Sequence, residues 1–186
     1  NPIPAKSDWF GCSVAISGST IVVGAYKDDL AATDSGLAYV FNATSGELMA
    51  TLANPTPAAD DWFGCSVAIS GSTVVVGACG DDTGMANSGS AYVFNAATGA
   101  LLATLANPTP ALGDYFGYSV AISGNTVVVG AFYDDTGATD SGSAYVFDAT
   151  TGELVATLAN PTPAASDWFG YSVAVSGSTV VVGTFH

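Results

Sequence analysis

Paired aspartates recur along this chain, and they are the residues whose types and spacing could most readily bind an ion. Each of three loops opens with Asp-Asp and carries a third aspartate or asparagine five residues after the pair. The residues of these loops are Asp28, Asp29 and Asp34, then Asp81, Asp82 and Asn87, then Asp134, Asp135 and Asp140. Calcium takes about 6 to 8 oxygen ligands from carboxylates, amides and carbonyls. The loops are therefore candidate sites for Ca²⁺ as a cofactor, although their spacing does not match an EF-hand.

The alternative use of these side chains is structural, because loop aspartates commonly accept hydrogen bonds from nearby backbone N–H groups. Both interpretations remain open for the Asp-Asp loops. A second set of aspartates stands before each aromatic-Phe-Gly motif, and for this set we favour a role as structural loop braces. The second set is Asp8, Asp61, Asp114 and Asp167.

Catalysis is not expected of this chain. It has no arginine, its only histidine is His186, and its lysines are Lys6 and Lys27. The usual nucleophile–base arrangements cannot be built from these residues. A carboxylate pair can serve a glycosidase, but here the acids repeat in every unit, whereas catalytic sites on repeat proteins usually break that symmetry.

The formal net charge of −14 restricts the partners of the chain. Nucleic acid is excluded because no basic groove is available to neutralise phosphates, and anionic membrane surfaces are disfavoured for the same reason. No apolar run reaches the length of a spanning helix, so we expect no membrane insertion. The charge favours divalent cations and basic partners.

The elements that hold the acidic loops come from an internal repeat. The dipeptide Asn-Pro recurs every 53 residues from Asn1, and the segments that follow it align without gaps. We therefore expect one repeat domain, whose last unit contains only its first two strands. The expected units are residues 1–53, 54–106, 107–159 and the half unit 160–186.

Each unit reads as four short β-strands, as in the second unit, where they cover about 66–70, 74–78, 90–94 and 100–106. β-Branched and aromatic residues dominate these segments, and no long stretch has a helical apolar period. A Ser-Gly-Ser-Thr or Ser-Gly-Asn-Thr tight turn joins the first two strands, with glycine where the backbone needs a positive φ. The sequence predicts an all-β protein.

The second strand indicates how the sheets are stacked. Val74, Val75 and Val76 do not alternate with polar residues, so both faces of this strand should be buried. A sheet buried on both faces must lie between copies of itself. We therefore predict β-propeller-type blades of four antiparallel strands, as three full repeats plus a half repeat. A linear stack or a solenoid is the alternative.

In such a blade, the loop entering the first strand and the loop joining the second to the third emerge at the same edge. These loops contain thirteen acidic residues of the sixteen in the chain, and we expect them to form one strongly negative rim. They are Asp8, Asp28, Asp29, Asp34, Asp60, Asp61, Asp81, Asp82, Asp114, Asp134, Asp135, Asp140 and Asp167. The other acids, Glu47, Asp148 and Glu153, fall at the opposite rim.

Aromatic residues before each Phe-Gly could stack on sugars, but packing between blades is the interpretation we favour. These residues are Trp9, Trp62, Tyr115 and Trp168. The three cysteines, Cys12, Cys65 and Cys79, stand where other repeats have aromatic residues. We expect them to be small buried thiols, because no zinc or redox spacing is present.

The motifs resemble a known family. Phe-Gly at 10–11, 63–64, 116–117 and 169–170, Val-Gly-Ala at 23–25, 76–78 and 129–131 and the following Gly-x-Ala-Tyr-Val-Phe are similar to the FG-GAP repeat. The resemblance implies the blades of an integrin α-chain-like propeller, or of bacterial secreted and surface proteins. The calcium loop of that family lies between its first and second strands, where this chain has only Ser-Gly-Ser-Thr or Ser-Gly-Asn-Thr.

We therefore expect a non-enzymatic, extracellular or cell-surface module for adhesion or ligand binding, with an acidic rim that is a candidate for calcium. A structural repeat protein that assembles into a multi-chain ring or filament is one alternative. A propeller fragment of a larger secreted hydrolase is another. The half repeat leaves an open strand edge, so we expect it to be completed by residues missing from this sequence, by a protein partner or by further copies of the chain.

Overall fold

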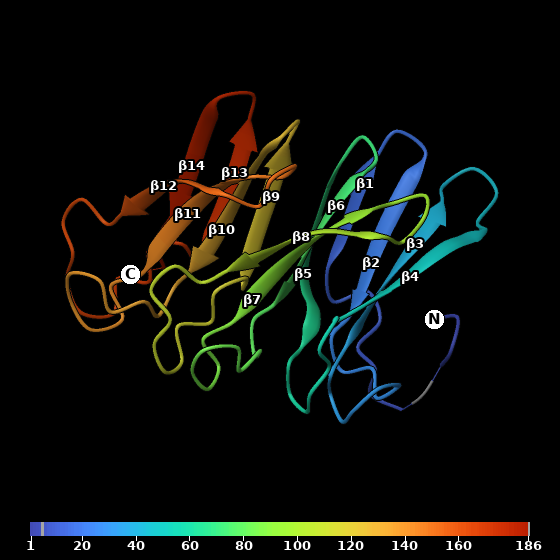
Figure 1. Cartoon of the computed structure of the whole chain (residues 1–186), viewed down its shortest axis with the longest axis horizontal. Helices are drawn as coiled ribbons and strands as arrows, with labels where there is room; N and C mark the ends of the chain where they lie inside the picture. The colour runs from blue at the N-terminus through green and yellow to red at the C-terminus, as the bar shows by residue number, and fades with distance from the viewer. Residues whose placement is uncertain (5, 186) are drawn as a thin grey trace.

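The computed structural model describes residues 1–4 and 6–185, which form a row of β-sheets standing side by side (Figure 1). The described residues contain fourteen strands in four antiparallel sheets and no helix. Three sheets have four strands and one has two, with neighbouring strands following chain order. The all-β prediction of three full repeats plus a half repeat is confirmed. None of the described residues belongs to a helix that could cross a membrane.

The strands of each sheet correspond to one sequence repeat. The first sheet contains β1 (Val14–Ser17), β2 (Thr20–Ala25), β3 (Leu37–Asn42) and β4 (Leu48–Ala53). The second contains β5 (Phe63–Ser70), β6 (Thr73–Ala78), β7 (Ser90–Asn95) and β8 (Leu101–Ala106). The third contains β9 (Ser119–Ser123), β10 (Thr126–Ala131), β11 (Ser143–Asp148) and β12 (Leu154–Ala159). The half repeat contains β13 (Ser172–Ser176) and β14 (Thr179–Gly183).

The second strand is buried on both faces in the second blade, which has a full blade on each side. Val74, Val75 and Val76 are each 0 % exposed. Val74 and Val76 pack towards the first blade, whereas Val75 packs towards Val127 and Val129 of the third. The prediction of sheets sandwiched between copies of themselves is therefore confirmed.

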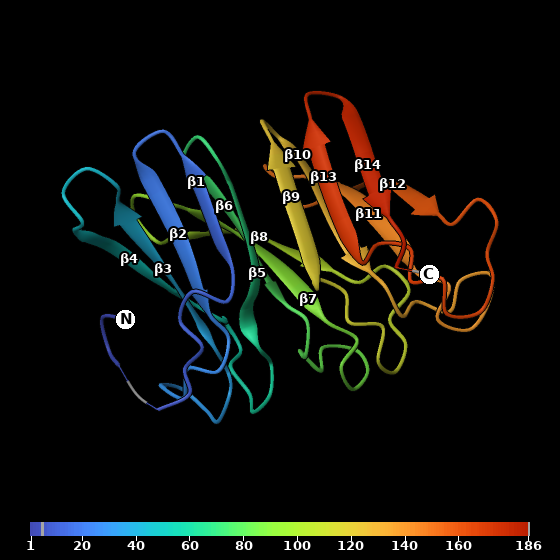
Figure 2. The same cartoon turned by 180° about the vertical axis from the view of Figure 1, so that it is seen from behind.

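The first strands of successive blades lie next to one another along one edge of the row, which Figure 2 shows for β9 and β13. At this edge the backbones approach closely. The Ser66 hydroxyl donates a hydrogen bond of 2.6 Å to the carbonyl oxygen of Gly117 in the next blade. A Cβ at Gly77 would overlap the same carbonyl. Glycine in Val-Gly-Ala therefore makes room for the Phe-Gly carbonyl of the following repeat.

Candidate functional site

The acidic loops of a blade meet at one end of the sheet, as the alternation of strands predicts. In the second blade, the Asn54 side-chain amide donates to Asp61 in the entering loop at 2.7 Å and to Asp81 in the β6–β7 loop at 3.2 Å. One amide thus connects the two loops. The expected common rim is present.

The first aspartate of each Asp-Asp pair is buried. Asp81 is 3 % exposed, and its Oδ1 accepts a hydrogen bond of 2.8 Å from the backbone N–H of Thr83. Its Oδ2 accepts one of 2.7 Å from the hydroxyl of Tyr92 in β7. Burial, followed by this hydrogen bond to Asp81, raises the pKa of Tyr92 well above its usual range. The same tyrosine–aspartate contact occurs in the other full repeats, where it joins Tyr39 to Asp28 and Tyr145 to Asp134.

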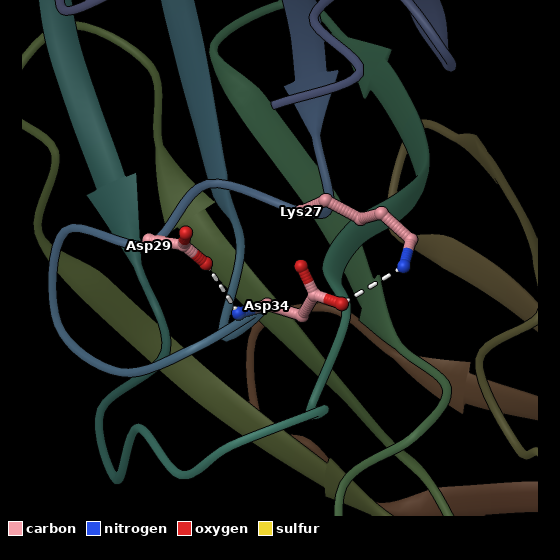
Figure 3. A network of polar contacts seen from close by, with 3 residues as sticks. All are labelled: Lys27, Asp29 and Asp34. Carbon is pink, nitrogen blue, oxygen red and sulfur yellow. Dashed lines mark hydrogen bonds and ion pairs between the residues drawn. The ribbon is translucent and has the colours of Figure 1, made fainter. Parts of the chain in front are cut away.

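The second aspartate of each pair is exposed. Its side chain accepts a hydrogen bond from the backbone N–H of the third candidate ligand in the same loop. Oδ1 of Asp29 accepts a hydrogen bond of 2.7 Å from the backbone N–H of Asp34 (Figure 3). Asp34 also forms an ion pair of 2.8 Å with Lys27. The equivalent loop contacts join Asp82 to Asn87 and Asp135 to Asp140. The third residue has a positive φ in every copy, between 51° and 52°, which aspartate and asparagine tolerate better than most side chains.

These contacts bear on the fit of a calcium ion. At least one oxygen of each paired aspartate already accepts a hydrogen bond from a backbone N–H group or a tyrosine hydroxyl. Within residues 1–4 and 6–185, no three His, Cys, Asp or Glu side chains are grouped so that they could hold a metal ion. The donor set therefore does not favour a metal, and we derive no function through one. Calcium binding by the Asp-Asp loops stays a prediction.

The aspartates before the Phe-Gly motifs make the contacts of loop braces. Oδ2 of Asp61 accepts hydrogen bonds from the backbone N–H of Ala58 at 2.6 Å and from Asn54. Asp114 and Asp167 accept from Ala111 and Ala164 in the same way. Asp8 accepts from the side-chain amide of Asn1. Burial is the main cause that raises the pKa of Asp61 and of Asp114 to about 6.

The carboxylates of the expected negative rim differ in their exposure to solvent. Six of its aspartates are at most 4 % exposed, because they are used inside the loops. They are Asp8, Asp28, Asp61, Asp81, Asp114 and Asp134. The charge that faces solvent comes mainly from Asp29, Asp60, Asp82 and Asp135. The rim is therefore acidic, but only part of its carboxylates face solvent.

An aromatic cleft of about 640 Å³ lies at the same end of the array. Its walls come from residues just before the first strands and just after the second strands, among them Trp9, Tyr26, Trp62, Tyr115 and Phe132. The start of a first strand and the end of a second strand lie at the same end of a blade. Successive repeats therefore bring these aromatic rings together at that end. Sequence reasoning missed this cleft, although the aromatic residues after Val-Gly-Ala were a signal for it.

The rings of the cleft both pack between repeats and remain accessible. Trp62 and Tyr115 stack with ring centroids 6.2 Å apart and planes at 3°, and Tyr26 contacts Trp62 edge-on at 6.4 Å. The favoured packing between blades is therefore present. Trp9, however, is 57 % exposed, and the indole N–H of Trp62 is buried with no hydrogen-bond partner among the described residues. The Lys27 ammonium lies 5.9 Å from the centroid of the Tyr26 ring.

The three cysteines also border this cleft. Cys79 is buried, and its hydrogen bond with Cys65, together with burial, raises its pKa. Cys12 is exposed and Cys65 only half-buried, so the expectation of three buried thiols is wrong for Cys12. The reason is that Cys12 lies just before β1 in the first blade, which has a neighbouring blade on one side only among the described residues (Figure 1).

Comparisons with known proteins agree with this architecture. A family model described as FG-GAP repeat matches residues 4–41, 47–94, 103–147 and 153–186. A search of curated proteins finds no match. Among solved structures, the crystal structure of the computationally designed Ika4 protein is similar, with 20 % sequence identity and a TM-score of 0.62. The match covers 97 % of this chain and 88 % of that one, and at this identity it supports the fold alone.

Proposed function

Because this chain belongs to the FG-GAP repeat family, we propose that it is a non-enzymatic binding module of the extracellular or cell-surface type. Its binding site is the aromatic cleft at the loop end of the blades, and its preferred ligands are basic groups of a protein partner. FG-GAP repeats are typical of extracellular proteins, which supports this location.

One observation carries the proposal, namely that the aromatic cleft opens at the end of the array where exposed aspartates gather. Cations are attracted to the faces of aromatic rings, by about 0.5–2 kcal/mol depending on how far they are desolvated. The position of Lys27 over the Tyr26 ring is an example within the molecule. Acidic side chains at the border would add attraction for an approaching basic segment.

The composition of the cleft supports binding without catalysis. Among the described residues that line it there is no histidine, aspartate or glutamate. Its polar groups are tyrosine hydroxyls, cysteine thiols, indole N–H groups and one lysine. Substrate activation by a general base of ordinary pKa has no obvious candidate in this set.

The test is a titration of the chain with a short lysine- and arginine-rich peptide, followed by calorimetry and tryptophan fluorescence. Trp62→Ala should weaken binding by about 10-fold, as expected for an aromatic anchor. Glu153→Gln, at the opposite rim, removes one negative charge and is the matched control. Equal binding by the Trp62 variant, or equal binding of a glutamate-rich peptide of the same length, would refute the proposal.

A second candidate function, assembly of a multi-chain ring or filament, is supported by the first blade. Val14 and Ile16 of β1 are 67 % and 66 % exposed, whereas Ile69, which occupies the position of Ile16 in the second blade, is 9 % exposed. A further blade could cover this apolar face by a head-to-tail contact, which closes into a ring or continues as a fibre. Light scattering at increasing concentration tests it, and a monomer at all concentrations would count against it.

A further inference from the structure

The second repeat carries cysteine at two positions that face each other in the third and last repeats. In the third repeat these positions hold Tyr118 and Phe132, whose ring centroids lie 4.4 Å apart. The corresponding rings of the last repeat are 5.0 Å apart. In the second repeat the same two positions hold Cys65 and Cys79. A pair of thiols therefore stands where two aromatic rings touch elsewhere in the array.

The backbone brings the two cysteines to one end of the same strand pair. β5 and β6 pair regularly up to Ser66, and after an irregular step the pairing resumes with Phe63 opposite Ala78. Cys65 lies in this irregular step, where a bulge can re-aim a side chain, and Cys79 directly follows Ala78. Paired residues of antiparallel strands have Cα atoms about 4.5–5.5 Å apart, and a disulfide spans about 4.4–6.8 Å between Cα atoms. The strand pair therefore brings the two side chains within reach of each other.

The two thiols contact each other, and both are free. The Cys79 thiol donates a hydrogen bond to the sulfur of Cys65, and the Cys65 thiol donates one of 3.6 Å to the carbonyl oxygen of Gly117. Burial by itself would raise the pKa of Cys65, but its hydrogen bonds, above all the one from Cys79, hold that pKa below its ordinary value. Because the thiolate is the nucleophile in thiol chemistry, Cys65 is the more reactive member of the pair.

The aromatic cleft gives small molecules access to this pair. Both cysteines line the cleft, whose volume is about 640 Å³. Cys65 is half-buried, whereas Cys79 is only 3 % exposed. A reagent in the cleft therefore reaches the sulfur of Cys65 more readily than that of Cys79.

We propose that Cys65 and Cys79 form a thiol–disulfide exchange site that takes small organic disulfides from the cleft. The Cys65 thiolate attacks one sulfur of the reagent, which gives a mixed disulfide and releases half of the reagent as a thiolate. The Cys79 sulfur then attacks the sulfur of Cys65 and expels the other half. Each cysteine gives up its proton, and each departing thiolate takes one up. One reagent disulfide is thus reduced to two thiols, while the two cysteines are oxidised to one intrachain disulfide.

Cys12 provides a comparison within the same cleft. It occupies in the first repeat the position of Cys65, but the position that faces it holds Tyr26. Burial is the main cause that raises the pKa of Cys12, so less of its thiolate is present at neutral pH. We expect Cys12 to react more slowly and to stop at the mixed disulfide. This chemistry goes beyond the binding proposed above, because it does not depend on which partner the cleft binds.

The experiment treats the 186-residue chain with bis(2-hydroxyethyl) disulfide at neutral pH and follows it by intact mass spectrometry. Cys12→Ser removes the exposed thiol and serves as the parent variant. The parent should lose the mass of two hydrogen atoms and retain no reagent. When Cys79→Ala is added, the product should instead retain half of the reagent on Cys65, because no second thiol is left to expel it. When Cys65→Ala is added, the reaction should slow by about 10-fold or more.

The position of the bond is determined in the unaltered chain. After oxidation, the chain is digested with pepsin at acid pH, where thiols are protonated and do not exchange. We expect a peptide pair that joins Cys65 to Cys79, and circular dichroism checks that each variant keeps its β-structure. A bond from Cys12 to either of the other cysteines would overturn the proposal. So would reagent retained on Cys65 in the parent variant, or a reaction that is as fast with Cys65→Ala as without it.

Discussion

The hydroxyl of Tyr92 donates a hydrogen bond of 2.7 Å to the carboxylate of Asp81, across the loop between β6 and β7. This bond connects the tyrosine of Ser-Ala-Tyr-Val-Phe to the first aspartate of the Asp-Asp pair. It gives a buried carboxylate a donor and fixes the start of the loop against the third strand. The same contact in the other full repeats explains why the two residue types recur together.

We expect Tyr92→Phe to destabilise the fold by about 1–3 kcal/mol, because it removes a donor from a carboxylate that is almost entirely buried. After the change, Oδ2 of Asp81 would retain only the longer hydrogen bond from Asn54, at 3.2 Å. Denaturant unfolding followed by circular dichroism measures the change. Tyr133→Phe is the control, since Tyr133 lines the aromatic cleft and does not donate to the buried Asp81 carboxylate. An equal effect of the two changes would contradict this account of the loop.

A second prediction comes from the edge of the row where the first strands of successive blades approach closely. We expect Gly77→Ala to cost about 2–3 kcal/mol of unfolding free energy, because its Cβ would overlap the backbone carbonyl of Gly117 and push the second and third blades apart. Gly183→Ala is the matched control at the same position of the half repeat. There a Cβ meets chiefly the hydroxyl of Ser172, a side chain that can rotate. Thermal unfolding of both variants measures the loss of stability. An equal loss in the two variants would contradict this explanation.

Much of the fold follows from the sequence, because the 53-residue period and the runs of valine are local signals. A run such as Val74–Val76 requires cover on both faces, and only neighbouring repeats can give it. The Tyr92–Asp81 bond was not predictable in this way, since it depends on the exact path of a loop between residues eleven positions apart. The cleft was missed because Trp62 and Tyr115 do pack against each other, which is all that the sequence indicated.

Buried carboxylates make the stability of this fold depend on pH. Burial raises the pKa of Asp61 in the folded chain to about 6, above its ordinary value of 3.8. The folded state therefore holds this proton more tightly than the unfolded state does. The resulting stability is complete below about pH 3.8 and is lost as the pH rises through about 6. Asp114 shifts in the same direction for the same reason.

We accordingly expect the melting temperature to fall between about pH 4 and pH 7, and Asp61→Asn to reduce the slope. Asp60→Asn is the control, because Asp60 is an exposed neighbour and its replacement removes the same charge. Differential scanning calorimetry over this range measures both. A slope that is unchanged in Asp61→Asn would show that burial of this carboxylate does not link stability to pH.

The open face of the first blade allows the same substitution to be compared in two environments. Ile69 of β5 is 9 % exposed and belongs to the core between the first and second blades, whereas Ile16 of β1 is 66 % exposed. We expect Ile69→Ala to lower the free energy of unfolding by about 2–4 kcal/mol, and Ile16→Ala to change it by less than about 0.5 kcal/mol. Denaturant unfolding at low protein concentration measures both. If the Ile16 variant lost as much as the Ile69 variant, the face of β1 would be covered in solution, and the concentration dependence of that loss would then identify a second copy as its cover.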